Sequence, residues 1–392
     1  MKEQPLSGIR VVDLTRVLAG PFCTMILGNL GAEVIKIERP VTGDESRHYG
    51  PFIDEEQKHS GYFISVNSGK KSIALDLENK RDKQIFTDLI RVSDVIVENF
   101  RPGVLERLGF SPDRIRDINP DIIYASASGF GHGGPDSQKP AFDMIIQAAS
   151  GIMSITGLED GRVTRVGTSI SDIVTGMYTA IGIIAALFRR GRSGGGTRVD
   201  VAMLDSMVSV LENAIIRCQI TRKVPGPIGS RHPSITPFGA FEARDGIVVI
   251  AVGHDRHFQL LCDLIGRPDL AKDSRFSTNN LRTQNVEALT ASINEALSAN
   301  TVDAWVRKFD EAGIVCGTIQ TVQDLFRSEQ LAWRKMLIPL EHDPSLRIAG
   351  NPVKYDDTPD ILTARKAPEL DEHREEIMRI IAGFPRDTTD NS

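Results

Sequence analysis

Residues 8–38, GIRVVDLTRVLAGPFCTMILGNLGAEVIKIE, contain the pattern that decides the fold. Residues 8–14 and 32–38 are short and largely apolar, as expected of buried strands, and residues 21–30 between them have helical spacing. Gly31 follows the last helical turn, where glycine commonly ends a helix. The stretch therefore predicts a strand, a helix and a second strand in succession.

The same alternation continues along the chain. Residues 72–77 and 94–98 are expected to be strands on either side of a helix at 81–92, and residues 122–126 form a further strand. Alternating strands and helices indicate right-handed crossovers and an open parallel sheet covered on both faces. The expected fold class is α/β, with a large Rossmann-like domain.

The length of 392 residues predicts two domains, because a single core stops growing at about 250–300 residues. Pro225 to Gly229 is rich in proline and glycine and marks a boundary. Beyond it, residues 238–243 and 247–252 resemble a hairpin, and helical patterns follow near 257–265, 286–298 and 301–312. Helices are also expected near 171–188 and 205–220. We expect a large domain from 1–225, a small α+β domain at 226–330, and a return to the large domain over 331–392, so that both chain ends build the large domain.

Composition narrows the class of protein. The 46 basic and 52 acidic residues give a net charge of −6, which argues against a nucleic-acid-binding surface. The four cysteines have no CxxC spacing and read as reduced thiols. The first residues lack the apolar core of a signal peptide, and the apolar tract near 177–188 is too short to span a bilayer. We expect a soluble, cytoplasmic protein without nucleic-acid or membrane partners.

Asp172 is the leading candidate for catalysis. It lies at the start of a long apolar helix, where the helix dipole stabilises a negative charge by about 0.3–1 kcal/mol. This position favours an ionised, nucleophilic carboxylate unless burial opposes it. The alternative is a simple helix-capping aspartate.

Two features test for dinucleotide binding. Glu38 and Arg39 end the second strand, where they would suit a ribose or its phosphate, but the preceding turn after residue 13 has no glycine fingerprint. A GxGxxG string at residues 129–134 leads into Pro135 rather than a helix, so a pyrophosphate would find no helix N-terminus. These features argue against an NAD(P)-dependent oxidoreductase.

Other polar groups have a functional and a structural interpretation. Arg101 and Arg107 follow a parallel strand and suit a phosphate, or are ordinary surface arginines. His254 and His257 lack a third ligand, so a solvated loop explains them better than a metal site. No metal site is expected.

Several ordered blocks resemble the family III CoA-transferases, and the similarity covers nearly the whole chain. The blocks are Asp13-Leu14-Thr15 with Ala19-Gly20-Pro21, residues 34–40, Gly43-Asp44, Asn67 with residues 71–76, residues 97–103, and Gly129-Phe130-Gly131 with Gly134-Pro135. Formyl-CoA transferase, carnitine CoA-transferases and α-methylacyl-CoA racemase belong to this superfamily. The resemblance implies an enzyme of acyl-CoA metabolism that forms an interlocked homodimer.

The resemblance also implies roles for individual residues. Asp172 would be the nucleophile, passing through a mixed anhydride and an aspartyl-CoA thioester. Acyl-CoA would be a substrate, with no prosthetic group. The residues that would contact CoA are Leu18, Ala19, Arg39, Leu75, Asn99, Phe100, Arg107, Pro140, Ala141, Phe142 and Asp143. Among these, Arg39 and Arg107 would hold phosphates, and Asn99 and Phe100 the pantetheine and base.

Departures from the pattern narrow the substrate. Phe142 stands where the racemase has a histidine, and proton exchange at an α-carbon needs two opposed bases. Leu18 replaces a glutamine of formyl-CoA transferase, and the glycine run of that enzyme is absent between 225 and 236, which argues against oxalate. Residues 229–237 are most similar to the succinate–glutarate-type enzymes. Arg231 or His232 would pair with the distal carboxylate, or would simply be basic residues of a boundary loop.

The sequence thus predicts transfer of CoA between an acyl-CoA and a free carboxylic acid, with a dicarboxylate such as succinate or glutarate on one side. Three alternatives stay open: an acyl-CoA racemase or isomerase on the same fold, an NAD(P)-dependent oxidoreductase, which needs a glycine fingerprint that this chain does not supply in context, and a non-catalytic acyl-CoA-binding protein.

Overall fold

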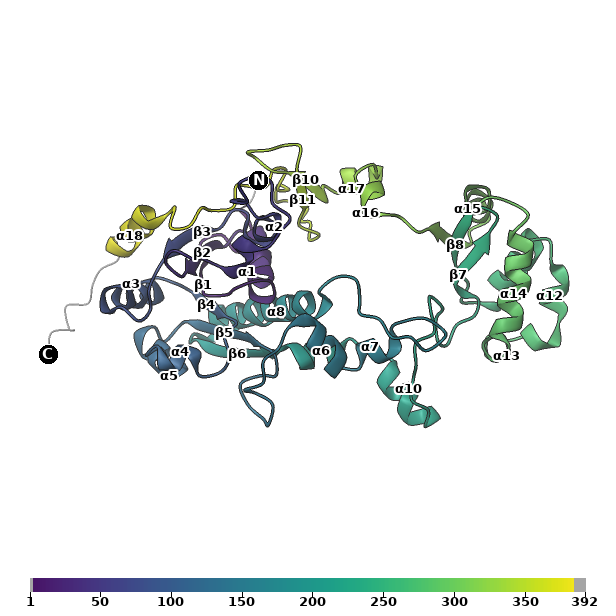
Figure 1. Ribbon diagram of the computed structural model, residues 1–392, viewed down its shortest axis with the longest axis horizontal. Helices are drawn as coiled ribbons and strands as arrows, with labels where there is room; N and C mark the ends of the chain where they lie inside the picture. The colour runs from purple at the N-terminus through teal and green to yellow at the C-terminus, as the bar shows by residue number, and fades with distance from the viewer. Residues whose placement is uncertain (1–2, 384–392) are drawn as a thin grey trace. The chain divides into compact units, whose positions relative to one another are not determined.

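The computed structural model describes residues 3–383, which form two compact units (Figure 1). The large unit comprises the described residues up to Met153, Arg165–Lys223 and the described residues from Glu329 onward. The small unit comprises Ser154–Thr164 and Val224–Ser328. Residues 154–164, which the sequence analysis placed in the large domain, thus group with the small unit.

A six-stranded parallel sheet forms the centre of the large unit. Its strands are β1 (Arg10–Asp13), β2 (Glu33–Glu38), β3 (Lys71–Ala74), β4 (Val95–Glu98), β5 (Ile123–Ser128) and β6 (Thr197–Ala202). They lie in the order β3-β2-β1-β4-β5-β6, and every neighbouring pair is parallel. The predicted open parallel sheet is confirmed. The strand order switches between β1 and β4: β2 and β3 are added on one side of β1, and β4, β5 and β6 on the other. Ligands of such sheets bind in the crevice beyond the carboxyl ends of the strands at that switch point.

Helices cover both faces of this sheet. The large unit contains α1 (Ala19–Asn29), η1 (Glu45–His48), α2 (Gly61–Asn67), α3 (Lys80–Arg91), α4 (Val104–Arg107), α5 (Pro112–Ile118), α6 (Asp143–Ala149), α8 (Ile170–Ser193), α9 (Met203–Ser209), α10 (Ala214–Thr221), α17 (Glu329–Trp333) and α18 (Arg374–Ala382), and α7 (Ile152–Ile155) lies at its boundary. The helix expected near 205–220 is therefore two helices, α9 and α10.

The alternation of side chains along β1 shows how the two faces are filled. Val11 and Val12 are both fully buried, but they belong to different clusters. Val11 packs with residues of α1 and α8, whereas Val12 packs with residues of α3, α5 and α18. Because successive strand residues point to opposite faces, an apolar run such as that of β1 requires cover on both sides.

The C-terminal segment returns to the large unit without adding a strand to its sheet. It supplies a separate antiparallel pair, β10 (Leu337–Pro339) with β11 (Arg347–Ala349), and then α18. Ile377 and Ile381 of α18 are buried in the cluster that contains α3. Both chain ends therefore build the large unit, but its six-stranded sheet comes from residues 10–202 alone.

Helix α8 is the one helix in residues 3–383 that is long and apolar enough to cross a membrane, with 24 residues and a mean hydropathy of 1.7. It is longer than the tract that the sequence analysis considered. One side of α8 packs on α1 so closely that a Cβ at Gly176 would lie 2.7 Å from the Ala19 carbonyl oxygen. Thr175 and Thr179 are fully buried on it. In this unit α8 thus packs as a core helix.

The small unit is built on a three-stranded antiparallel sheet. Strands β7 (Phe238–Ala243), β8 (Gly246–Ala251) and β9 (Val315–Thr318) lie in that order, and β7 and β8 form the expected hairpin. The helices are α11 (Asp255–Leu264), α12 (Pro268–Lys272), η2 (Ser274–Phe276), α13 (Asn279–Gln284), α14 (Val286–Leu297), α15 (Val302–Glu311) and α16 (Val322–Leu325). Trp305 and Phe309 of α15 are buried in its core. This unit has the expected α+β character.

Candidate active site

A cavity of about 960 Å³ lies at the carboxyl ends of β1, β2, β3 and β4. The loop after β1 contributes Leu14 to Arg16, and the segment after β2 contributes Arg39, Pro40 and residues 42–44. Leu75 and its neighbours follow β3, and Phe100 follows β4. The cavity therefore occupies the crevice that the strand order predicts for a ligand.

Five cationic side chains line this cavity. Arg16 and Lys36 pair with the carboxylates of Glu45 and Asp44, at 2.6 and 2.8 Å, and the other three are Arg39 after β2, Lys83 on α3 and Arg107 on α4. Arg39 and Arg107 are exposed to solvent and thus accessible to a ligand. Clustered arginine and lysine side chains are suited to phosphate groups. Lys83 escaped the sequence analysis because a lysine on a polar helix face gives no signal of its own.

The structure separates the residues that were expected to contact CoA. Arg39, Leu75, Phe100 and Arg107 line the cavity. Leu18, Ala19, Asn99 and residues 140–143 are not among its lining residues. These seven positions divide into the start of α1, the loop after β4 and the start of α6.

The Asn99 side chain is hydrogen-bonded to the backbone of Arg16. Its side-chain oxygen accepts a hydrogen bond from the Arg16 N–H at 2.9 Å, and its amide nitrogen donates to the Arg16 carbonyl oxygen at 2.8 Å. The guanidinium of Arg16 lies over the Phe100 ring, 5.0 Å from its centroid. The Asn99 amide therefore fixes the loop after β1, and Phe100 is the residue of this pair that faces the cavity.

Asp172 is the third residue of α8 and is partly buried. Burial, together with the negative charge of Asp143, raises its pKa from 3.8 to about 7. Within residues 3–383, no cation or hydrogen-bond donor acts against this rise. The helix dipole was expected to favour the ionised form, but loss of solvation outweighs it. Near neutral pH the group is therefore divided between acid and carboxylate.

Asp143 is the first residue of α6 and is buried beside the start of α8. Its carboxylate accepts hydrogen bonds from the Ser171 N–H at 3.0 Å and from the Gln147 side chain at 2.8 Å. The neighbouring Phe142 is 72% exposed. Of residues 140–143, Asp143 therefore contacts the start of α8, beside Asp172, whereas Phe142 points to the surface.

The start of α1 lies beside the face of α8 that carries Asp172. Gly176 is one turn after Asp172 and therefore shares its face, and the Ala19 carbonyl and the Cys23 N–H lie against Gly176. This contact brings Leu18 and Ala19 toward the candidate nucleophile from α1. This position of Leu18 and Ala19 depends on the close crossing of α1 and α8, which Gly176 permits because it has no side chain.

Tyr62, on α2, was missed by the sequence analysis. Burial raises its pKa to about 12, and the negative charge of Asp172 adds to the rise. Its ring meets that of Tyr49 edge-on, with centroids 5.8 Å apart. Tyr62 therefore stands near Asp172, and a phenol with such a pKa is a hydrogen-bond donor at neutral pH.

Arg231 and His232 belong to the small unit. Arg231 Nε donates to Glu159 at 3.1 Å, and the His232 ring packs against Phe238 at 5.3 Å between centroids. The Ser234 N–H donates to His232 Nδ1 at 3.1 Å, which leaves Nε2 as the protonated ring nitrogen. A carboxylate ligand of Arg231 would thus compete with Glu159.

The glycine string at 129–134 follows β5 and continues through turns, and the next helix, α6, begins at Asp143. No helix begins directly after the string, as expected. His254 and His257 lie with ring centroids 6.0 Å apart. In the described part of the chain, no group of three or more acidic, cysteine or histidine side chains could hold a metal ion.

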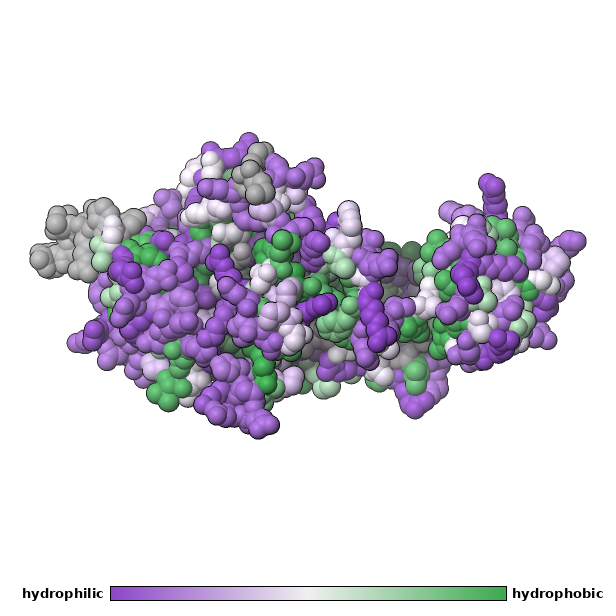
Figure 2. All heavy atoms as spheres, turned by 90° about the horizontal axis from the view of Figure 1, so that it is seen from above, coloured by the Kyte–Doolittle hydropathy of each residue, from purple (hydrophilic) through white to green (hydrophobic). Residues whose placement is uncertain are grey.

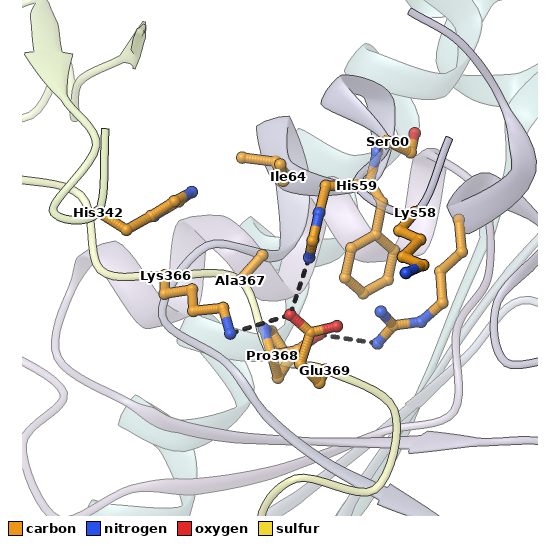
Figure 3. A pocket seen from close by; sticks show the side chains of 11 residues that line it. Lys58, His59, Ser60, Ile64, His342, Lys366, Ala367, Pro368 and Glu369 are labelled. Atoms are coloured by element: carbon orange, nitrogen blue, oxygen red, sulfur yellow. Dashed lines mark hydrogen bonds and ion pairs between the residues drawn. The ribbon is translucent and has the colours of Figure 1, made fainter. Parts of the chain in front are cut away.

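A second, much smaller cavity lies against the C-terminal segment of the large unit (Figure 3). Figure 3 shows His59 and Lys366 pointing toward the Glu369 carboxylate, to which they are joined at 3.2 and 2.9 Å. Its volume of about 20 Å³ leaves no room for a nucleotide. The large cavity is therefore the candidate substrate site.

Comparison with known proteins agrees with this geometry. The family model "CoA-transferase family III" matches residues 6–374. Acetyl-CoA:oxalate CoA-transferase from Acetobacter aceti is 45% identical over 94% of this chain and 93% of its own. Succinyl-CoA:glutarate CoA-transferase from Mus musculus is 38% identical over 97% of this chain and 87% of its own.

Solved structures give the same result. The crystal structure of a CAIB/BAIF family protein from Brucella suis is 37% identical, with a TM-score of 0.86, and the match covers 97% of this chain and 100% of that one. The match to the family model over nearly the whole chain and the shared fold lead to one conclusion. The chain belongs to the family III CoA-transferases, the enzymes that move CoA between an acyl-CoA and a carboxylic acid.

Proposed function

We propose that this enzyme transfers CoA to or from a dicarboxylic acid, with Asp172 as its covalent nucleophile. The observation that carries this proposal is the Asp172 carboxylate itself, which is partly buried and whose pKa is raised to about 7. A carboxylate in water is a weak nucleophile because of its hydration. Removing that hydration at the start of α8 makes Asp172 reactive once it is ionised.

The reaction has four steps. The Asp172 carboxylate attacks the thioester carbonyl, the C–S bond breaks, and CoA leaves as thiolate from a mixed anhydride. The thiolate attacks the aspartyl carbonyl and expels the donor acid, which leaves an aspartyl-CoA thioester. The acceptor carboxylate then attacks this thioester and releases the thiolate again. Finally the thiolate attacks the acceptor's acyl carbon and frees Asp172 as a carboxylate.

The cavity of the large unit supports acyl-CoA as the substrate. Its volume of about 960 Å³ reaches the upper end of the usual range for ligand sites, about 300–1,000 Å³. Arg39, Lys83 and Arg107 are suited to the phosphates, and Leu75 and Phe100 offer apolar surface to the rest of the nucleotide. Retaining CoA in this cavity between steps keeps the effective concentration of its thiolate high.

We assign the distal carboxylate of the acid to Arg231 and His232. Arg231 already binds a carboxylate, that of Glu159, so its guanidinium suits a ligand of this kind. Both curated relatives named above act on a dicarboxylic acid by their names, oxalate in one and glutarate in the other. Our proposal is a longer diacid such as succinate or glutarate.

We further propose that the enzyme is an interlocked homodimer that resists dilution. Green hydrophobic patches interrupt the mostly hydrophilic surface of the large unit (Figure 2). Exposed apolar side chains lie along α8 and α10, including Ile181 at 58%, Phe188 at 68% and Ile220 at 74%. Apolar surface of this extent is typical of subunit contacts. Sedimentation across a hundredfold range of concentration measures the dimer directly.

The deciding experiment combines transfer and trapping. The protein is incubated with succinyl-CoA and oxalate, malonate, glutarate or acetate, and new CoA esters are identified by mass. We expect glutaryl-CoA to form fastest. Quenched digests should carry an adduct on Asp172, and hydroxylamine should modify that residue only after acyl-CoA is added. An active enzyme that never shows an adduct at Asp172, or an active Asp172→Asn variant, contradicts the mechanism.

The alternatives make different predictions. A racemase needs a second base opposite Asp172, but Phe142 is exposed and the pKa of Tyr62 is about 12. Incubation in D₂O should therefore leave the α-carbon of the acyl-CoA unlabelled. A non-catalytic binding protein would form no new ester. We also propose a cytoplasmic location, because all four cysteines are free, and cell fractionation tests it.

A further inference from the structure

The loop that joins β1 to α1 has an unusual backbone at Val17. Its φ is 65°, in the left-handed region that favours glycine. A valine there is strained, because its branched side chain crowds the backbone. Nucleotide-binding folds of this type commonly use glycines in the corresponding turn, and this chain has none between residues 13 and 19. Something outside the loop must therefore hold this conformation.

Hydrogen bonds hold the loop at Thr15 and at Val17 itself. The Asp13 carboxylate accepts from the Thr15 N–H at 2.9 Å, and Lys36 Nζ donates to the Thr15 carbonyl at 2.8 Å. The Val17 N–H itself donates to the two oxygens of Asp44, at 3.1 and 3.3 Å. The backbone group of the strained residue thus depends on a single carboxylate.

Asp44 is itself fixed by a buried ion pair. Lys36 Nζ lies 2.8 Å from an Asp44 oxygen, and these side chains are 0% and 1% exposed. The Ser46 N–H and hydroxyl also donate to Asp44, at 2.9 and 2.7 Å. Burial would raise the pKa of Asp44, but Lys36 and these hydrogen bonds hold it well below its ordinary value. Asp44 therefore stays charged over the whole working range of pH.

The loop connects this ion pair to both parts of the active site. Thr15, Arg16, Lys36 and Asp44 line the large cavity. Directly after Val17 come Leu18 and Ala19, and the Ala19 carbonyl lies against α8 one turn after Asp172. The backbone direction at Val17 thus sets one wall of the cavity and the start of α1 together.

We infer that Asp44 is a positioning residue for acyl-CoA: its carboxylate, paired with Lys36, holds Val17 in the left-handed conformation and so replaces the glycine turn of other nucleotide-binding folds. The inference rests on the proposed function only in that CoA is the ligand. It assigns Asp44 no contact with the reacting atoms. Its effect is on substrate affinity rather than on the chemical step.

Glycine substitution makes the test sharp, because glycine adopts a positive φ without strain. We expect Asp44→Asn to weaken CoA binding, measured by calorimetry, and to raise KM for succinyl-CoA at least tenfold, with kcat within about threefold. Adding Val17→Gly to the Asp44→Asn variant should recover at least a third of the CoA affinity that Asp44→Asn loses. A general loss of structure would not be repaired by a change at this one position.

Val41 provides a matched control. It also has a left-handed backbone, with φ of 69°, but its side chain is 93% exposed and is not among the cavity's lining residues. Val41→Gly relieves strain of the same kind in the loop after β2 and leaves the Val17 backbone unchanged, so Asp44→Asn with Val41→Gly should bind CoA as weakly as Asp44→Asn alone. Equal rescue by both glycines, or normal CoA affinity in Asp44→Asn, overturns the inference.

A second variant covers the case in which Asp44→Asn does not fold. Val17→Pro keeps both Lys36 and Asp44, but it fixes φ near −65° and removes the N–H that donates to Asp44. It should weaken CoA binding at least tenfold, and a Val17→Pro enzyme with natural CoA affinity refutes the inference. Failure of the proposed function looks different, because the natural chain would then bind CoA in calorimetry without forming any new ester.

Discussion

Replacing Asp172 by asparagine should stabilise the enzyme at alkaline pH while abolishing its activity. The pKa of Asp172 is raised from 3.8 to about 7 by burial and by Asp143. The folded chain therefore binds this proton more tightly than the unfolded chain does. Stability is fully retained below about pH 4, falls as pH rises toward 7, and stays lower above that.

The magnitude follows from the size of the shift. A rise from 3.8 to about 7 corresponds to an upper limit of about 4 kcal/mol above pH 7, at about 1.4 kcal/mol per unit. Because Asp172 is only partly buried, solvent screening reduces the expected value to about 2–4 kcal/mol. Asparagine cannot ionise, so Asp172→Asn avoids this cost. Its advantage over the natural enzyme should be small near pH 4.5 and reach its full size at pH 8.5.

Thermal unfolding of the ligand-free protein measures the effect, since about 1 kcal/mol shifts Tm by about 2–4 °C in domains of about 150–250 residues. The quantity of interest is the difference in Tm between variant and natural enzyme, followed from pH 4.5 to 8.5. Asp205 is a matched control, because it is also the third residue of its helix, α9, but is exposed. Asp205→Asn should show no such trend. A Tm difference for Asp172→Asn that is constant across this range would refute the argument from burial.

Three further predictions concern charge and affinity. Asp143→Asn removes a negative charge beside Asp172, so the acid limb of the pH profile of kcat/KM, expected near pH 7, should move to lower pH. The limb should stay well above pH 4, because Asp172 remains buried. An unchanged limb would show that Asp143 does not act on Asp172. Arg39→Gln and Arg107→Gln should each weaken CoA binding about tenfold or more and lessen its salt dependence. Arg101 is exposed but does not line the cavity, so the Arg101→Gln variant should bind CoA normally. An equal loss of affinity in Arg101→Gln would place the phosphates elsewhere. Arg231→Gln should raise the KM for glutarate about tenfold but leave the KM for acetate unchanged. Arg162, which pairs with Asp160 in the same unit, provides the neutral control as Arg162→Gln. An equal rise in KM for both acids would show that Arg231 takes no part in substrate recognition.

The sequence by itself determined the architecture of the large unit and the family. Strand and helix periods are local properties, so the runs at 8–14 and 32–38 predicted β1 and β2, and residues 238–243 and 247–252 predicted the hairpin. Strand β6 was not predicted. Its residues, TRVDVA, are half-exposed and alternate with charges, so they lack the apolar run of the inner strands.

Only the tertiary structure decided the chemistry of the candidate site. Position at the start of a helix predicted an ionised Asp172, but its protonation depends on burial and on Asp143, 29 residues earlier in the chain. Likewise, Asn99 follows a strand at a ligand-binding edge, yet its amide is occupied by the Arg16 backbone. A sequence pattern records which faces are apolar, whereas solvation and partner choice depend on segments that meet only when the chain is folded.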